Sequence, residues 1–172
     1  MHTNLSKEFD HIALELIQLL SSFQEEELNS VPFEGSWTAG QVGDHLLKSY
    51  QIVRLLARES EASQRQPDQK VELIKKVMLD FETTRQAPEG VAPSFEPVNK
   101  ESLLNSIQKC REQFKEVIAT TDLHQTVSGF VLPQFGEFTK LEWVYFSLYH
   151  TQRHIHQLQR IVRLKEQGAW KD

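Results

Sequence analysis

The segment from Leu141 to Leu164 has the hydrophobic spacing of one long helix, and it carries His150 and His154 one turn apart. Residues four positions apart lie about 40° from each other around a helix, so the two imidazoles share a face. The opposite side is polar, which is typical of a helix packed against neighbours. The histidine pair is therefore predicted to point inward, on an apolar face that also holds Trp143, Phe146, Gln157 and Ile161.

The same spacing predicts three more long helices, over Asn4 to Glu26, Thr38 to Leu56 and Lys100 to Ala119. Between the second and third of them, Glu61 to Asn99 is broken by several prolines and keeps a helical stripe only near Lys70 to Arg85. A connection of that length can cross the height of a bundle. We predict an all-α four-helix bundle with a long crossover between helices 2 and 3 that contains a short extra helix. One domain, residues 1–172, is expected from the length.

Two capping boxes mark helix starts. Thr38 is followed three residues later by Gln41, and Thr139 by Glu142, so that each side chain can satisfy a free backbone amide of the other residue. The segment from Thr120 to Phe138, which contains Gly129, Pro133 and Gly136, is predicted to be a connecting loop.

Composition disfavours several classes of function. The net charge is −5 and the 19 Lys and Arg residues are scattered, so the chain lacks the basic footprint of a nucleic-acid-binding protein. No apolar run approaches the roughly 20 residues of a membrane span, and no signal peptide is evident, so a cytoplasmic protein is expected. The single cysteine, Cys110, is interpreted as a packed thiol rather than a nucleophile.

His45 is a third histidine on the apolar face of a predicted helix. Two histidines at i and i+4, with a third from a neighbouring helix, can occupy one face of a metal ion and leave positions for water or substrate. Because ligand imidazoles must be unprotonated, metal affinity would fall as the pH drops through about 6.5. The alternative, that the three histidines are hydrogen-bonded core residues, stays open, because the spacing alone is weak evidence.

Two better-known metal schemes do not fit. The residue after His150 is Thr151, so the general-base glutamate of the zinc protease helix is missing. Di-iron carboxylate bundles need two Glu-x-x-His pairs, and the one such pair here, Glu8 with His11, places its histidine away from the core.

Three segments carry a family resemblance. Residues 37–46, WTAGQVGDHL, begin a helix with Trp-Thr and reach a histidine; residues 149–158, YHTQRHIHQL, hold a His-x3-His-x2-Gln pattern; and residues 133–139 form a Gly-containing lead-in. In these features the chain resembles the DinB-like (DinB/YfiT) superfamily of four-helix-bundle metalloenzymes. The resemblance implies up-down-down-up connectivity and a divalent nickel, zinc, iron or manganese ion. The implied metal ligands are His45, His150 and His154.

The resemblance also implies a class of activity. Members of the superfamily include thiol-dependent transferases and hydrolases, so the first hypothesis is an enzyme that activates water or a low-molecular-weight thiol against a small-molecule substrate. A thiol is slightly favoured, because no acid or base is evident. No catalytic side chain is identified. Gln41, Ser49 and Gln157 could line the site, or serve only in capping and packing.

The second hypothesis is a non-catalytic bundle that binds a metal, a ligand or a partner. Tyr145 and Tyr149 lie on the polar side of the last helix and are predicted to be exposed. Aromatic residues are enriched at protein interfaces, so these two tyrosines are candidates for a homodimer face.

Overall fold

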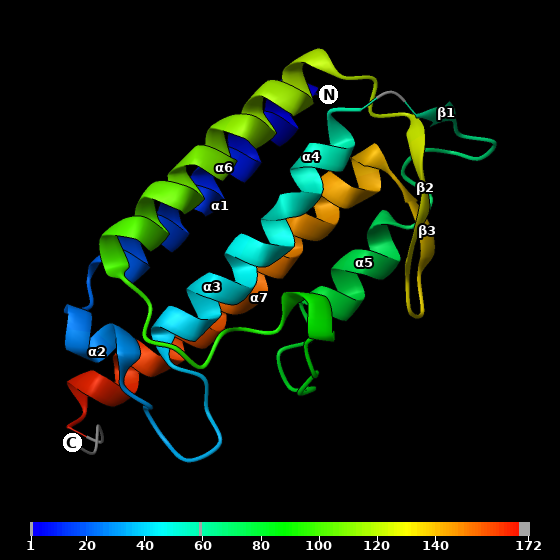
Figure 1. The fold of residues 1–172 in the computed structure, drawn as a ribbon. Coiled ribbons are helices and arrows are strands. Elements are labelled where there is room, and N and C mark those ends of the chain that lie inside the picture. The colour runs from blue at the N-terminus through cyan, green and yellow to red at the C-terminus, as the bar shows by residue number, and fades with distance from the viewer. Residues whose placement is uncertain (1, 59, 169–172) are drawn as a thin grey trace.

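Four helical segments form a bundle in the computed structural model, which describes residues 2–58 and 60–168. They are α1 (His2–Ser21), α3 (Ala39–Ser49), α6 (Lys100–Thr120) and α7 (Lys140–Glu166). The second segment continues beyond α3 through a 3₁₀ turn, η1 (Tyr50–Ile52), and α4 (Val53–Leu56). In Figure 1, α6 lies along α1 and α3 lies along α7. The predicted four-helix bundle is therefore present.

Two helices are shorter than predicted. The first ends at Ser21 instead of Glu26, where the hydroxyls of Ser21 and Ser22 donate to backbone carbonyls of the last turn, and a short α2 (Glu25–Asn29) follows. The crossover helix α5 covers Val71–Met78 instead of Lys70 to Arg85. It stops because the Asp80 carboxylate accepts from the next backbone amides, an arrangement that favours a turn over a helix. A 3₁₀ turn, η2 (Glu89–Val91), follows later in the crossover.

The fold is mostly helical, as predicted, but it also contains a small sheet, and the prediction of a loop over Thr120 to Phe138 was wrong. That segment forms β2 (Gln125–Leu132) and β3 (Gly136–Thr139), and β1 (Glu61–Ala62) completes an antiparallel sheet of order β1-β2-β3. The turn between β2 and β3 uses positive φ angles at Gln134 and Gly136. The register shifts between Thr126 and Val131, around Gly129 with its φ of 78°. Because of this irregularity, side chains do not alternate between the two faces as they do along a regular strand, and this alternation is the pattern that predicts a strand from sequence.

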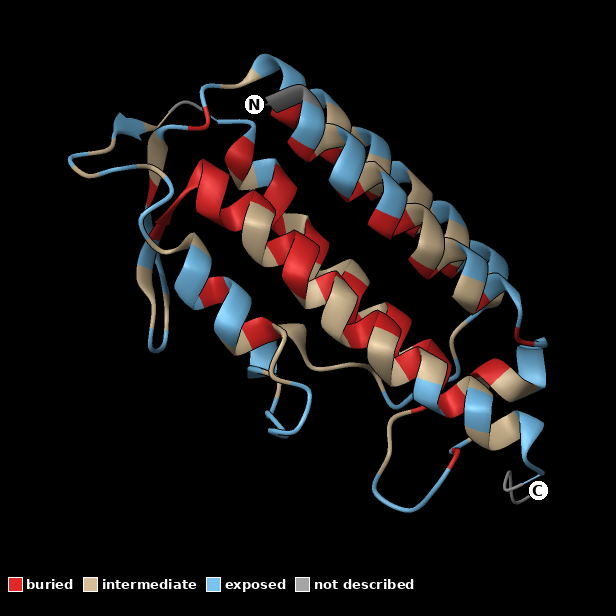
Figure 2. Cartoon of the chain, turned by 180° about the vertical axis from the view of Figure 1, so that it is seen from behind, coloured by how far each residue is buried: buried red, intermediate tan, exposed pale blue. Residues whose placement is uncertain are grey.

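The core lies between the helices. Figure 2 shows the buried residues on the sides of the bundle helices that face one another. Phe9, Tyr50 and Phe114 bring rings from three helical segments into contact, with centroids 4.4–5.9 Å apart. Cys110 is buried in this core, as predicted, and burial raises the pKa of its thiol.

The predicted exposure of Tyr149 was wrong. Helix α5 packs against α7, and Tyr149 is buried with its ring stacked on half-buried Tyr145. Burial, with smaller effects from Tyr145, Glu8 and Glu72, raises the pKa of Tyr149 to about 12. The helical spacing of α7 could not reveal this, because the crossover helix that packs there comes from a distant part of the chain.

Within the part of the chain that the structure describes, none of the helices has the length and apolar character that crossing a membrane requires.

Candidate metal centre

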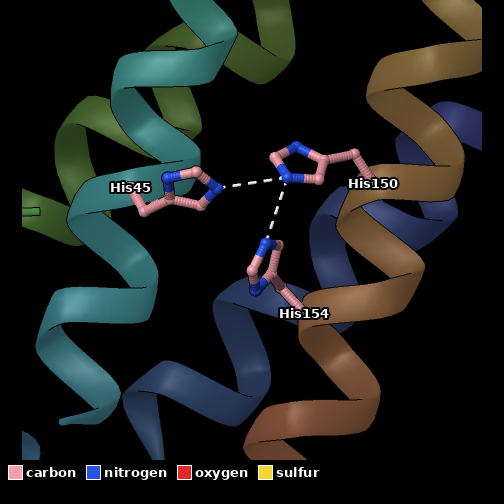
Figure 3. A group of neighbouring side chains, drawn as sticks. All are labelled: His45, His150 and His154. Carbon is pink, nitrogen blue, oxygen red and sulfur yellow. Dashed lines mark hydrogen bonds between the residues drawn. The ribbon is translucent and has the colours of Figure 1, made fainter. Parts of the chain in front are cut away.

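Three histidine side chains meet between α3 and α7 (Figure 3). The Nε2 atom of His150 lies 3.1 Å from Nε2 of His45 and 3.0 Å from Nε2 of His154. One nitrogen from each ring lies within 4.8 Å of the other two. The structure thus brings together the three histidines that the sequence analysis proposed as ligands, and we call them the histidine cluster.

The two predicted capping boxes are present and fix the helices that carry the cluster. Thr38 Oγ1 accepts from the backbone amide of Gln41, and Gln41 Oε1 accepts from the amide of Thr38, both at 3.0 Å. Thr139 and Glu142 make the same reciprocal pair at the start of α7, at 3.0 and 3.1 Å. Each box satisfies backbone donors that the first turn leaves free, so the helix start is well defined.

A buried ion pair ties the start of α7 to the crossover. Glu142 is fully buried, and both its oxygens accept from the guanidinium of Arg65 at 2.6 Å. The backbone amide of Lys70 adds a third donor at 2.8 Å. Sequence reasoning missed this pair because Glu142 was explained by its capping role and Arg65 lies in a segment without periodicity.

Two histidines of the cluster have a fixed proton on the ring nitrogen that points away from it. His45 Nδ1 lies 2.7 Å from the backbone oxygen of Val91, which can only accept, so this nitrogen donates. His154 Nδ1 lies 2.8 Å from the amide oxygen of Gln157 and donates in the same way. In a neutral imidazole the other nitrogen then carries a lone pair. His45 and His154 therefore each direct an Nε2 lone pair toward His150.

This arrangement fits a divalent cation. If His150 Nε2 carries a proton, it can donate that proton to only one of the two Nε2 lone pairs, on His45 or on His154. The other lone pair then faces His150 without a hydrogen bond. A cation can accept all three lone pairs at once. The Nε2 atoms of His45, His150 and His154 would hold such an ion, because separations of 3.1 and 3.0 Å from His150 bring the three donors together. Imidazole donors suit zinc, iron and nickel.

Burial keeps the cluster neutral. His45 and His154 are 3% and 8% exposed, and His150 keeps an intermediate exposure. Burial lowers the pKa of His45, lowers that of His154 to about 3, and lowers that of His150 well below its usual value. Repulsion among the histidines adds to the shifts at His150 and His154. Neutral imidazoles are the form that binds metal.

Aromatic rings flank the cluster on two sides. The Trp37 indole lies nearly parallel to His154, at 6.3 Å and 12°, and its centroid is 5.1 Å from that of His45. Phe146, one turn before His150, stacks on that histidine at 5.3 Å. Both aromatic side chains are half-buried. They shield the cluster on either side.

The other sequence candidates divide into two groups. Gln157 contacts the cluster directly, through His154. Gln41 caps α3 and donates to Ser94 O at 3.1 Å, while the Ser49 hydroxyl donates to the backbone oxygen of His45 at 2.9 Å. Their observed partners are backbone groups, as their capping and packing interpretation expects. Val91 was missed, because a loop carbonyl has no side-chain signature in a sequence.

Comparisons with known proteins agree on one family. The sequence model of the DinB superfamily matches residues 8–158. The chain is 26% identical over 157 residues to the uncharacterized protein YuaE of Bacillus subtilis strain 168, covering 89% of this chain and 94% of that protein.

Two solved structures share the fold. The four-helix bundle protein TT2238 aligns with a TM-score of 0.59 at 20% identity, over 93% of this chain and 99% of that one. YfiT from Bacillus subtilis, described as a probable metal-dependent hydrolase with an unusual four-helix bundle topology, aligns with a TM-score of 0.61 at 16% identity, over 99% and 89%. At these identities the likeness concerns the arrangement of the helices.

Proposed function

The chain belongs to the DinB superfamily, and from this membership and the geometry of the histidine cluster we propose that it is a metal-dependent enzyme acting on a small molecule. His45, His150 and His154 hold the divalent ion. The observation that carries the proposal is the pair of fixed Nδ1 protons, which leaves Nε2 lone pairs converging on one point. The proposal includes the up-down-down-up connectivity that the family resemblance implies.

The donor set determines what the site can do. Among residues 2–58 and 60–168, these three histidines are the sole group of three or more ligating side chains close enough to share an ion, and no carboxylate or thiolate is part of it. Three neutral ligands leave the full charge of a divalent ion uncompensated. Such an ion, with positions open to solvent, would supply a nucleophile at neutral pH by lowering the pKa of a water or a low-molecular-weight thiol. Nickel, zinc, iron and manganese are the candidates.

The chain's own groups beside the cluster bind and orient rather than transfer protons. Apart from one another, the hydrogen-bond and ring-stacking partners of the three rings are Trp37, Phe146, the Gln157 amide and the Val91 carbonyl, none of which titrates near neutral pH. This favours a substrate whose leaving group departs without a protein acid. It also favours a nucleophile that the metal itself activates, and thiol-dependent S-transfer suits this second condition, since a thiolate needs no general base once formed.

Hydrolysis is the other reaction within the proposal. It is supported by the structural likeness to YfiT, which is described as a probable metal-dependent hydrolase. The two reactions differ only in whether water or a thiol is the attacking group, and both use the same three ligands.

The first experiment is metal analysis by elemental mass spectrometry of untagged protein, His150→Ala and His156→Ala, all prepared identically. His156 lies on the same helix but stacks on Phe81 outside the cluster, which makes it a matched control. We expect about one metal per chain in the wild type and in His156→Ala, and little in His150→Ala. Equal metal content in all three proteins would overturn the proposed ligand set.

A second experiment tests catalysis. Wild-type protein loaded with each candidate metal is screened against esters and amides, and against electrophiles in the presence of low-molecular-weight thiols. Activity should disappear in the double variant His45→Ala/His150→Ala and persist in His156→Ala. Full activity in the double variant would contradict the proposal. Metal binding without turnover, accompanied by a loss of folding stability on metal removal, would instead support the non-catalytic alternative.

A further inference from the structure

A segment of the crossover lies across α3 and is fastened to it by side chains. We call residues 88–94 the strap; in Figure 1 this part of the chain, drawn in green, crosses α3 on its way to α6. Its carbonyls at Val91, Ala92 and Ser94 accept hydrogen bonds from α3, at 2.7, 2.8 and 3.1 Å, and its amide at Ser94 donates one at 2.8 Å. The α3 partners occupy one face of the helix: His45, Lys48, Gln41 and Asp44.

The sequence of the strap explains why its carbonyls are available. Pro88 and Ala92 have extended backbone angles, with ψ of 148° and 139°, and Ala92 precedes Pro93. A residue before proline is held in this extended region. The backbone hydrogen bonds of the turn, from Val91 N–H to Pro88 O and from Ala92 N–H to Glu89 O, leave the carbonyls of Val91 and Ala92 for other donors. The single turn η2 between them carries Val91 toward the cluster. The carbonyls of Val91 and Ala92 therefore depend on side chains of α3 for partners.

Asp44 and Lys48 fasten the strap on the C-terminal side of Val91. Asp44 Oδ2 accepts both from the Ser94 amide and from Lys48 Nζ, which lies 2.9 Å away. Lys48 Nζ also donates to Ala92 O, the carbonyl next to that of Val91. The two side chains thus brace each other and hold both strap residues. Neither makes a hydrogen bond to a histidine ring. Apart from a charge effect on His45, in which Asp44 raises and Lys48 lowers its pKa, they act on the cluster through the backbone of the strap.

We infer that Asp44 and Lys48 are positioning residues for His45: by fixing the strap, they hold the Val91 carbonyl where it accepts the Nδ1 proton of His45. The inference rests on the proposed metal-binding function, because the Nε2 lone pair is useful only to an ion. A loose strap leaves His45 free to rotate or to place its proton on Nε2, and a protonated Nε2 cannot ligate. Partners that orient ligand histidines commonly change metal affinity by 10–100-fold.

The test uses the double variant Asp44→Ala/Lys48→Met, which removes both fastenings and leaves the net charge unchanged. The matched control is Glu116→Ala/Lys109→Met, a charge-neutral pair of exposed residues on α6. Long-range ¹H–¹⁵N NMR of the metal-free proteins reports the tautomer of each histidine. We expect one Nδ1–H form of His45 in wild type and control, and a mixture in the double variant. The single variant Asp44→Asn keeps an acceptor for the Ser94 amide, so most of its His45 should be in the Nδ1–H form.

A competition titration with a chromophoric Zn²⁺ chelator gives the second readout. Zn²⁺ affinity should fall about tenfold in the double variant and stay within twofold of wild type in the control. A single Nδ1–H tautomer of His45 in the folded double variant overturns the inference, whatever the Zn²⁺ affinity. If the wild type binds no Zn²⁺ or other candidate metal, the proposed function fails, and the tautomer comparison still decides whether the strap orients His45.

Discussion

The Nδ1 atom of His154 lies 2.8 Å from the amide oxygen of Gln157, three residues further along α7. The glutamine therefore holds the proton of His154 on the side away from the cluster, as the Val91 carbonyl does for His45. His154 is oriented from its own helix and His45 from the crossover. The relationship gives the Gln of the His-x3-His-x2-Gln pattern a physical role that its spacing alone does not supply.

Gln157→Ala should weaken metal binding without removing a ligand. Without its acceptor, His154 can turn or change tautomer, so we expect Zn²⁺ affinity to fall roughly 10-fold or more, measured by competition with a chromophoric chelator. The control is Gln152→Ala, a half-buried glutamine on the same helix. An equal loss of affinity in both variants would show that the effect comes from the helix and not from the hydrogen bond.

The metal-free protein should lose stability on acidification. The histidines of the cluster have lowered pKa values in the folded state because they are buried, whereas unfolded histidines titrate near 6.5. Below about pH 6.5 the unfolded state therefore binds protons that the folded state does not, and the free energy of unfolding falls as the pH drops. The slope is up to ~1.4 kcal/mol per pH unit for each histidine.

Urea unfolding of metal-free protein at pH 7, 6 and 5 measures this slope. His150→Ala, which removes one of the buried imidazoles, should show a shallower slope than the wild type between pH 6 and 5. An unfolding free energy that stays constant over that range in the wild type would mean that the cluster is protonated while folded.

Metal affinity should persist to lower pH than histidine residues in general would allow. Three ligands with a pKa of about 6.5 would lose ~50-fold in affinity between pH 7.5 and pH 6.0, through proton competition alone. Burial lowers the pKa of all three cluster histidines. The fall in metal affinity that the sequence analysis expects near pH 6.5 should therefore occur at lower pH. We predict a change of less than about fivefold in Zn²⁺ affinity over this interval. A fall of ~50-fold would indicate ligands that titrate as if exposed.

Local signals in the sequence were sufficient for the bundle and the cluster. The capping boxes at Thr38 and Thr139 mark the helix starts, and periodicity alone puts His45, His150 and His154 on inward faces. These features depend on residues within one or two turns of each other, which is the range over which helical geometry is fixed.

Contacts between distant segments were not accessible in this way. The Val91 carbonyl reaches His45 across 46 positions, and Arg65 reaches Glu142 across 77. Neither pairing leaves a spacing pattern in the sequence. Both contacts depend on the position of the crossover, which is determined by packing. The hairpin β2–β3 was missed for a different reason, because the distortion around Gly129 interrupts its alternation.

The ion pair of Arg65 with Glu142 should be required for stability rather than for metal binding. Arg65→Met leaves the buried Glu142 carboxylate without its bidentate partner, and removing one member of a buried pair typically costs about 3–5 kcal/mol. Since Arg65 is partly exposed, water can replace some of the lost interaction, so we expect the lower end of this range, measured by urea unfolding at pH 7. The double variant Arg65→Met/Glu142→Gln should recover part of the loss, because a neutral amide needs no counter-charge and its oxygen still caps α7.

Zn²⁺ affinity per folded molecule should stay near that of the wild type in both variants, since the pair contacts none of the three histidines through its hydrogen bonds. If Arg65→Met instead lowered Zn²⁺ affinity without changing the free energy of unfolding, the start of α7 would have to control the position of the histidines directly.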